Sequence, residues 1–269
     1  MTRQNYYKRR SQRRREAIDE QLVVELVRRE RWRQPRLGGR KLRHMLDGEL
    51  RAAGVSIGRD RFYEVLKRHD LLVVRPRRGS RTTDSRHGFR VHPNRARDLA
   101  LTGPHQLLVS DITYLRTRGG FVYLALVMDA FSRTIVGYDC SDSLEVEGAL
   151  RALRMAQGQL PAGVVAMHHS DRGIQYCCRA YIEQLARGGM SISMTEENHC
   201  YENSQAERVN GTLKHELGLD ETFEDAAEAK GAVAEAVAIY NHDRPHQSLG
   251  YRTPMEVHGR ARGRPNRAA

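Results

Sequence analysis

Apolar residues recur every three to four positions between residues 16 and 74, and this period predicts three short helices. Glycines at 38 and 39 interrupt the first run, and a turn over 53–56 interrupts the second. The apolar positions are Ile18, Leu22, Leu26 and Val27, then Leu42, Met45 and Leu46, then Phe62, Val65 and Leu66. The pattern therefore predicts a small all-α domain at the start of the chain.

The polar faces of these expected helices are basic, with Arg40, Lys41, Arg43, Arg59, Arg61, Lys67 and Arg68. They resemble a helix-turn-helix-like DNA-binding domain over 16–74, with Arg40 and Lys41 as candidate DNA contacts. The alternative is a small helical bundle whose charges are only solvated. Residues 1–15 are expected to form a basic N-terminal arm. Residues 75–100 are rich in Arg and poor in apolar residues, which predicts a basic linker that cannot fold alone.

From residue 101 onward, runs of consecutive apolar residues predict strands. Close turns favour an antiparallel meander of three strands, over 107–115, 121–128 and 134–138. Helices are then expected over 144–157, 181–187, 204–217 and 226–240, and strands over 164–168 and 191–194. This order predicts an α/β domain over 101–260, with a ribonuclease-H-like mixed five-stranded sheet and flanking helices. A basic tail follows over 261–269.

The composition favours a protein that binds nucleic acid. The 269 residues include 45 Lys and Arg against 33 Asp and Glu, a formal net charge of +12, and such charge displaces the counterions condensed on a polyanion. No stretch approaches the roughly 20 apolar residues of a membrane span, and residues 1–15 lack the apolar core of a signal peptide. The cysteines form no C-x-x-C pair and are expected to be reduced thiols. We expect a cytoplasmic, nucleoid-associated protein with no membrane partner.

Three carboxylates stand out by position. Asp111 interrupts an apolar strand, Asp171 directly follows a strand, and Glu207 lies on a helix. Each alone has an ordinary explanation: an ion pair with Arg, a turn cap, or a solvent-exposed charge. Together they form an oxygen-only set that suits Mg²⁺ or Mn²⁺. Two such ions, roughly 3.5–4 Å apart, clamp the attacking and leaving oxygens of phosphoryl transfer, and Asp111 is the candidate for the ligand that bridges them.

The three acids resemble the D-D-E triad of retroviral integrases and bacterial insertion-sequence transposases. In that triad 35 residues lie between the last two acids, and 35 residues also lie between Asp171 and Glu207. Local motifs resemble the integrase-like catalytic subunit of the IS-three family more closely still. They are Ser110-Asp111-Ile112-Thr113-Tyr114, Asp129-Ala130-Phe131-Ser132-Arg133 with Ile135-Val136-Gly137, His169-Ser170-Asp171-Arg172-Gly173-Ile174-Gln175-Tyr176, Thr212-Leu213-Lys214-His215-Glu216 and the segment from Tyr240 to Tyr251. Leu108, where the family often has Trp, and Glu202, where it often has Asp, depart from the pattern outside the triad.

The resemblance covers essentially the whole chain and implies a transposase, a polynucleotidyl transferase with a D-D-E two-metal mechanism. It implies two Mg²⁺ or Mn²⁺ ions per active site, held by Asp111, Asp171 and Glu207. The implied partners are DNA (element ends and target), further copies of the chain in a homo-oligomer on DNA, and an upstream-frame protein or fusion. Two alternatives remain open: a plain ribonuclease-H-like nuclease, and a catalytically silent DNA-binding regulatory remnant of a transposase.

Position predicts further DNA contacts. Asn203 and Lys214 lie four residues before and seven after Glu207, so all three share one helix face. Arg172, Gln175 and Tyr176 leave the same loop as Asp171. The alternative for Lys214 is an ordinary solvent-exposed lysine.

The neighbouring histidines are not predicted to ligate metal, because neither His168 nor His169 has a partner at helical metal-binding spacing. His169 is expected either to orient Asp171 or to be structural. The segment from Arg244 to His246 either fixes a helix end against the core or contacts DNA.

Overall fold

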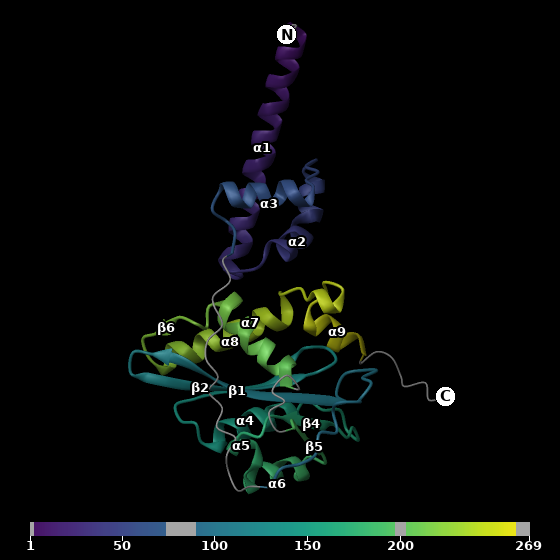
Figure 1. Cartoon of the computed structure of the whole chain (residues 1–269), viewed down its shortest axis with the longest axis vertical. Coiled ribbons are helices and arrows are strands. Elements are labelled where there is room, and N and C mark those ends of the chain that lie inside the picture. The colour runs from purple at the N-terminus through teal and green to yellow at the C-terminus, as the bar shows by residue number, and fades with distance from the viewer. Residues whose placement is uncertain (1–2, 74–89, 197–202, 262–269) are drawn as a thin grey trace, which may run out of the picture. The chain divides into compact units, whose positions relative to one another are not determined.

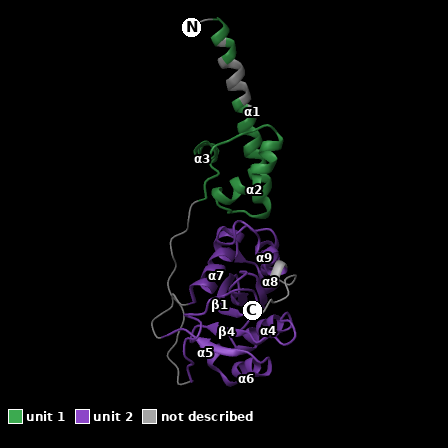
Figure 2. Ribbon diagram, turned by 90° about the vertical axis from the view of Figure 1, so that its right-hand side faces the viewer, with its two compact units in different colours: residues 1–76 green, residues 77–269 purple. Residues whose placement is uncertain are grey.

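The computed structural model describes residues 3–73, 90–196 and 203–261 (Figure 1). The chain divides into two compact units, Met1–Pro76 and Arg77–Ala269 (Figure 2). The first unit is filled by one apolar cluster, and the second by two. No helix in the described ranges is long and apolar enough to cross a membrane.

Three helices form the N-terminal unit: α1 (Arg3–Arg33), α2 (Gly39–Ala52) and α3 (Arg59–Arg68). Apolar residues of all three meet in its core, among them Val23, Val27, Leu42, Leu46, Phe62 and Leu66. Helix α1 begins at Arg3, so most of the expected arm over 1–15 is helical. Residues 3–15 contain neither Gly nor Pro, the two residues that most disfavour a helix interior.

The second unit contains a mixed six-stranded sheet. Its strands are β1 (Leu107–Thr117), β2 (Gly120–Asp129), β3 (Ile135–Ser141), β4 (Met167–Ser170), β5 (Ser191–Met194) and β6 (Thr222–Phe223). The order is β3-β2-β1-β4-β5, with β6 paired to β1. The first three strands are antiparallel, whereas β4, β5 and β6 join in parallel. Strand β1 is therefore central.

Helices cover both faces of this sheet (Figure 1). They are α4 (Val146–Gln157), α5 (Ile174–Cys177), α6 (Arg179–Arg187), α7 (Ser204–Leu217), α8 (Ala226–His242) and α9 (Pro254–Ala261). Residues of α7 and α8 share one apolar cluster with Leu107 and Val109 of β1, and residues of α4 and α6 share the other with Leu108. Because side chains alternate along a strand, a sheet covered on both faces needs the nearly continuous apolar runs seen in the sequence.

One glycine allows helix α4 to pack closely on the sheet. A Cβ at Gly137 of β3 would overlap the backbone carbonyl oxygen of Ala152 in α4. Backbone cannot move aside as a flexible side chain can, so position 137 requires glycine. This gives a structural reason for the Ile135-Val136-Gly137 motif.

The structure corrects three expectations. Strand β4 begins at Met167 rather than at residue 164, the sheet has a sixth strand, and residues 90–98 of the expected linker contact the second unit. The amide groups of Arg95 and Ala96 donate hydrogen bonds to Ser193 Oγ, at 2.9 and 3.1 Å. Ala96 also packs against the apolar core, and Arg97 pairs with Glu196 at 3.0 Å.

Candidate active site

Asp111 lies near the middle of β1 and is partly buried. Its Oδ1 accepts a hydrogen bond from the amide of Ile112 at 3.0 Å, and its Oδ2 accepts one from Asn210 Nδ2 at 2.8 Å. Two donors thus fix the orientation of the carboxylate. A carboxylate held in this way presents its remaining lone pairs in a defined direction.

Asp171 lies one strand away, directly after β4. Val109 of β1 pairs with His169 of β4 in parallel register, so two residues further on Asp171 comes level with Asp111. Adjacent strands are about 4.8 Å apart. Asp171 Oδ1 accepts a hydrogen bond from the amide of Gly173 at 2.9 Å. The parallel pairing therefore brings together two aspartates that are 60 residues apart in sequence.

Glu207 lies in the first turn of α7 and is exposed. Two buried asparagines bond to β1, one on each side of Glu207 in sequence: Asn203, the N-cap residue of α7, and Asn210 within α7. Asn203 Nδ2 donates to the carbonyl oxygen of Ser110 at 2.9 Å, and Asn210 donates to Asp111. Residues three and four apart share a helix face, so the face of α7 that carries Glu207 is held against the strand that carries Asp111.

The three carboxylates interact through their charges. Burial raises the pKa of the Asp111 carboxyl to about 7, and the negative charge of Asp171 contributes in the same direction. The hydrogen bonds from Asn210 and Ile112 oppose this rise, while Glu207 adds a further increase. The charged form of Asp111 is thus disfavoured by its two acidic neighbours, which is the repulsion that a cation relieves.

The donor set fits hard divalent cations, because all three side chains offer carboxylate oxygens. Within residues 3–73, 90–196 and 203–261, however, no three His, Cys, Asp or Glu side chains are gathered as a ready-made metal site. The charge of Asp171 affects the pKa of Asp111 more than the charge of Glu207 does.

A buried polar network supports the two strands beneath the acids. His168 Nε2 lies 2.8 Å from Ser110 Oγ and 2.9 Å from the Tyr181 hydroxyl. Burial, helped by the charge of His169, lowers the pKa of His168 to about 3. His169 Nδ1 contacts Ser193 Oγ at 2.8 Å. Among the alternatives for His169, this contact favours the structural one.

The predicted DNA contacts of the second unit lie in two environments. Lys214 Nζ stands 4.6 Å from the centre of the Tyr114 ring, and Arg172 Nε and Gln175 Nε2 donate to the backbone oxygens of Thr195 and Leu144. All three are partly accessible. Tyr176 and Asn203 are only 2% exposed. In this structure they cannot reach a DNA strand, and burial gives each of them a role inside the fold.

In the N-terminal unit, Arg40 is exposed and Lys41 is partly buried at the start of α2. Both remain candidate DNA contacts. Arg244 lies in the second unit, is buried and pairs with Glu216 of α7 through two hydrogen bonds of 2.9 and 3.0 Å. Of the two alternatives for its segment, this pairing supports the fixing of a helix end.

Sequence reasoning missed the role of Asn210. Helix geometry could have indicated it, because Asn210 lies three residues after Glu207 and so on the same face. It also missed the network around Asp129, a fully buried acid at the end of β2. Its oxygens accept hydrogen bonds from the amides of Ser132 and His105, at 2.7 and 2.6 Å. That network shapes the turn after β2 and is not part of the site.

Comparison with known families defines the class of the second unit. The Integrase core domain family matches residues 102–200, and a second family of the same description matches residues 188–254. A solved structure of similar fold is the intasome of simian T-cell lymphotropic virus in complex with PP2A regulatory subunit B56 gamma. Its TM-score is 0.51 at 17% identity, over 87% of this chain and 73% of that chain. The fold is that of a retroviral integrase core, which confirms the ribonuclease-H-like class.

Curated relatives narrow the class to a family. The chain is 36% identical over 213 residues to the insertion element IS600 uncharacterized 31 kDa protein of Shigella sonnei, 78% of either chain. It is 34% identical over 215 residues to transposase InsF for insertion sequence IS3A of Escherichia coli K12, 78% of this chain and 74% of that relative. The chain belongs to the IS3 family of insertion-sequence transposases.

Proposed function

We propose that this protein cuts DNA at the ends of an insertion sequence and joins them to target DNA, with Asp111, Asp171 and Glu207 as ligands of two Mg²⁺ or Mn²⁺ ions. The observation that supports this most strongly is the parallel pairing of β1 with β4, which brings Asp171 level with Asp111, together with the Asn210 hydrogen bond that holds α7 to Asp111. Groups that repel one another across a sheet and a helix, in a chain of this family, are suited to share cations.

The residues would divide the work as follows. Asp111, central and held by two donors, would hold both ions, and Asp171 and Glu207 would each hold one of them. Such ions would supply activation of a water or a 3′-hydroxyl and stabilisation of charge on the phosphate. The triad supplies ligands only, so no covalent protein–DNA intermediate is expected.

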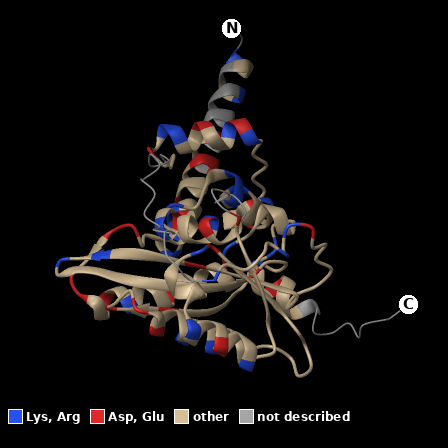
Figure 3. Ribbon diagram, turned by 60° about the horizontal axis from the view of Figure 1, so that its bottom comes forward, with Lys and Arg blue, Asp and Glu red and all other residues tan. Residues whose placement is uncertain are grey.

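The distribution of charge supports DNA as the substrate. Residues 1–76 hold 21 Lys and Arg against 10 Asp and Glu, a net +11 of the chain's +12. Residues 77–269 hold 24 against 23, a net +1. Figure 3 shows both kinds of residue on the described elements. Affinity for DNA that depends on counterion release would therefore come mainly from the N-terminal unit. Lys214 and Arg172 would act locally beside the acids.

Transposition must bring two element ends together, so we propose that the active form is a homo-oligomer on DNA. We also propose that an upstream reading frame contributes a partner or a fused segment, as the family resemblance implies. The size of the oligomer on paired ends, measured by light scattering, tests the first proposal. Strand-transfer activity of the chain alone, compared with activity after the upstream product is added, tests the second.

The central test is strand transfer of pre-cut element ends into a plasmid. Asp171→Asn and Glu207→Gln should each abolish both cleavage and joining while duplex binding persists. Asp142→Asn is the matched control, because Asp142 is an exposed acid of the same unit, paired to Lys230 at 3.0 Å. Cleavage without joining by the parent chain would support the plain nuclease, and binding with neither reaction would support the silent remnant. Normal activity of either triad variant would refute the assigned ligands.

A further inference from the structure

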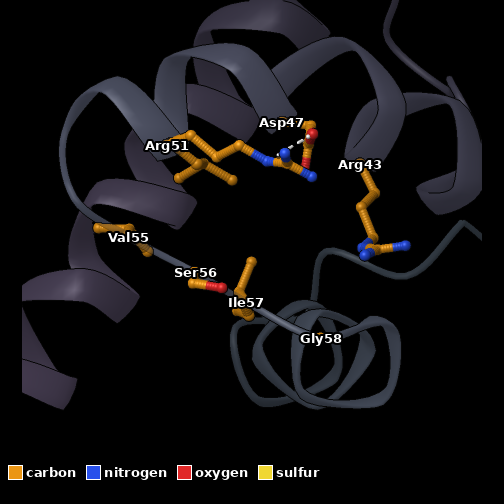
Figure 4. A pocket seen from close by; sticks show the side chains of 8 residues that line it. Arg43, Asp47, Arg51, Val55, Ser56, Ile57 and Gly58 are labelled. Carbon is orange, nitrogen blue, oxygen red and sulfur yellow. Dashed lines mark ion pairs between the residues drawn. The ribbon is translucent and has the colours of Figure 1, made fainter.

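A small pocket lies in the N-terminal unit between α2 and the turn that leads into α3 (Figure 4). Its lining is Arg43, Asp47, Leu50, Arg51, Val55, Ser56, Ile57 and Gly58. In Figure 4 the side chains of Arg43, Arg51 and Ser56 surround the space above Gly58, the residue that precedes the first turn of α3. The pocket belongs to a unit that is distinct from the candidate active site.

Arg43 differs from the other arginines near the pocket. Arg51 pairs with Asp47 at 2.9 Å, and Arg59 with Asp60 at 2.8 Å. The Arg43 side chain is partly buried, its Nε is fully buried, and that nitrogen has no hydrogen-bond partner among the described residues. A guanidinium that gives up part of its hydration without a partner costs free energy. Because Arg43 also lines the pocket, its guanidinium charge is available to an anionic ligand there.

The pocket lining includes one further side-chain donor and ends at Gly58, the residue before α3. Helix α3 has Gly58 as its N-cap, and no side chain caps it. The amide groups of a first helical turn have no partner within the helix and lie at the positive end of the helix dipole. Ser56 contributes a hydroxyl from the turn. The one acid of the lining, Asp47, is already engaged by Arg51. Two cations against one anion leave the side-chain lining with a net charge of +1.

We propose that this pocket binds one phosphate group of the DNA backbone, held by Arg43, the Ser56 hydroxyl and the N-terminus of α3. This inference rests on the proposed function and adds to it a specific contact that carries no sequence information. Charge complementarity identifies the ligand: the unit around the pocket has a net charge of +11. A planar guanidinium with several donors matches the oxygens of a phosphodiester.

The sharpest test places a carboxylate in the pocket without harming the fold. Gly58 has φ −70° and ψ 162°, and a Cβ there meets nothing within 4 Å, so Gly58→Asp is tolerated. Asp is also a favoured N-cap residue whose carboxylate bonds to first-turn amides. The substitution should therefore keep or raise thermal stability while it blocks the anion site. Gly48→Asp is the matched control, because Gly48 is exposed on α2, outside the pocket, with the same free space.

Binding of the full-length chain to a fluorescent duplex, measured by anisotropy at several salt concentrations, gives the readout. Gly58→Asp should weaken binding roughly tenfold, the lower range for a lost hydrogen bond to a charged group. It should also make the slope of log affinity against log salt shallower by about 0.9, which corresponds to one phosphate contact. Gly48→Asp should stay within about threefold of the parent, with an unchanged slope.

Arg43 gives an independent second comparison. Arg43→Gln should reproduce the loss of affinity and slope, whereas Arg43→Lys should keep the slope and lose part of the affinity, because it keeps the charge without the planar fork. Arg29→Gln is the control for charge: Arg29 lies on α1, away from the pocket lining, and pairs with Glu49 at 2.7 Å.

The following outcomes would overturn the assignment of the pocket as a phosphate site. Equal effects of Gly58→Asp and Gly48→Asp would show a general charge effect rather than a site. If inorganic phosphate raises the melting temperature of the parent but not of Gly58→Asp, while both bind duplex equally, the pocket is a free-anion site. If the parent binds no duplex at any salt concentration, the proposed DNA function fails with it. A parent that binds and joins DNA while the paired variants behave alike would refute the pocket alone.

Discussion

Replacing Asn210 by Leu should separate activity from stability. Asn210 is 5% exposed, and its Nδ2 donates to Asp111 Oδ2 at 2.8 Å. Its Oδ1 is buried and has no hydrogen-bond partner within the described residues. Leu has a similar volume, so the substitution removes one hydrogen bond and one unsatisfied acceptor together. These two effects oppose each other, and the free energy of unfolding should change by no more than about 1 kcal/mol.

The effect on activity should be larger. A hydrogen bond to a charged acceptor contributes about 1.5–3 kcal/mol, and this one orients the proposed bridging ligand. If that contribution is lost in the transition state, strand transfer of pre-cut ends falls roughly tenfold to a hundredfold. Duplex binding should not change, because Asn210 lies in the unit with the lower net charge.

Asn241→Leu is the matched control for this experiment. Asn241 is equally buried and makes two hydrogen bonds, of 2.9 and 3.0 Å, to the backbone of Ile135. Its loss leaves a buried amide and a buried carbonyl unsatisfied, which costs about 2–4 kcal/mol of stability, but folded molecules should keep their specific activity. Urea unfolding and strand transfer measured on both variants decide the matter. If Asn210→Leu loses less than twofold in rate, or loses stability as Asn241→Leu does, then Asn210 does not orient Asp111.

Three further predictions concern stability and are measured by urea unfolding. Gly137→Ala should lower the free energy of unfolding by about 1–3 kcal/mol, because the added Cβ would meet the backbone of Ala152. An unchanged midpoint of urea unfolding would contradict this packing. Arg244→Met should cost about 1.5–3 kcal/mol, because it removes two charged hydrogen bonds to Glu216, and Arg244→Met with Glu216→Gln should recover part of the loss. The lowered pKa of His168 means that the unfolded chain binds a proton between pH 6.5 and about 3 that the folded chain does not. The free energy of unfolding should therefore decrease as the pH is lowered through this window, by up to roughly 1.4 kcal/mol per pH unit. His168→Gln should show a smaller decrease.

The fold was predictable where apolar residues line both faces of the sheet. Strands β1, β2 and β3 have runs that no helix period explains, and they were predicted nearly as they are. Strand β4 was misplaced, because Val164 and Val165 are apolar but lie 37% and 72% exposed. The true strand contains His168, His169 and Ser170, which are polar and buried. His168 contacts Ser110 and Tyr181, and His169 contacts Ser193; a hydrophobic pattern cannot reveal such partners on other segments.

The candidate site was predictable in part for a similar reason. The three acids were visible because a carboxylate is unusual in an apolar strand and because their spacing resembles a known triad. Tyr176 and Asn203 come from the same motifs, yet both are buried, so membership in a motif did not distinguish DNA contact from support of the fold. The partner of Asp111 at position 210 depends on the pairing of α7 with β1, which is a tertiary contact.

The unequal charges of the two units follow from the chemistry that each would perform. A site that gathers three carboxylates makes the local potential more negative, which disfavours the approach of a phosphodiester. Residues 77–269, at net +1, offset this little with long-range positive charge. The offset in the proposed mechanism is local and comes from the divalent ions, whereas affinity for DNA comes from the N-terminal unit. Salt should therefore weaken binding of the duplex but have little effect on the turnover of duplex that is already bound. Mg²⁺ should control this turnover and have little effect on binding. If substitutions in the α2–α3 pocket changed the Mg²⁺ requirement of bound DNA, this division of labour would be wrong.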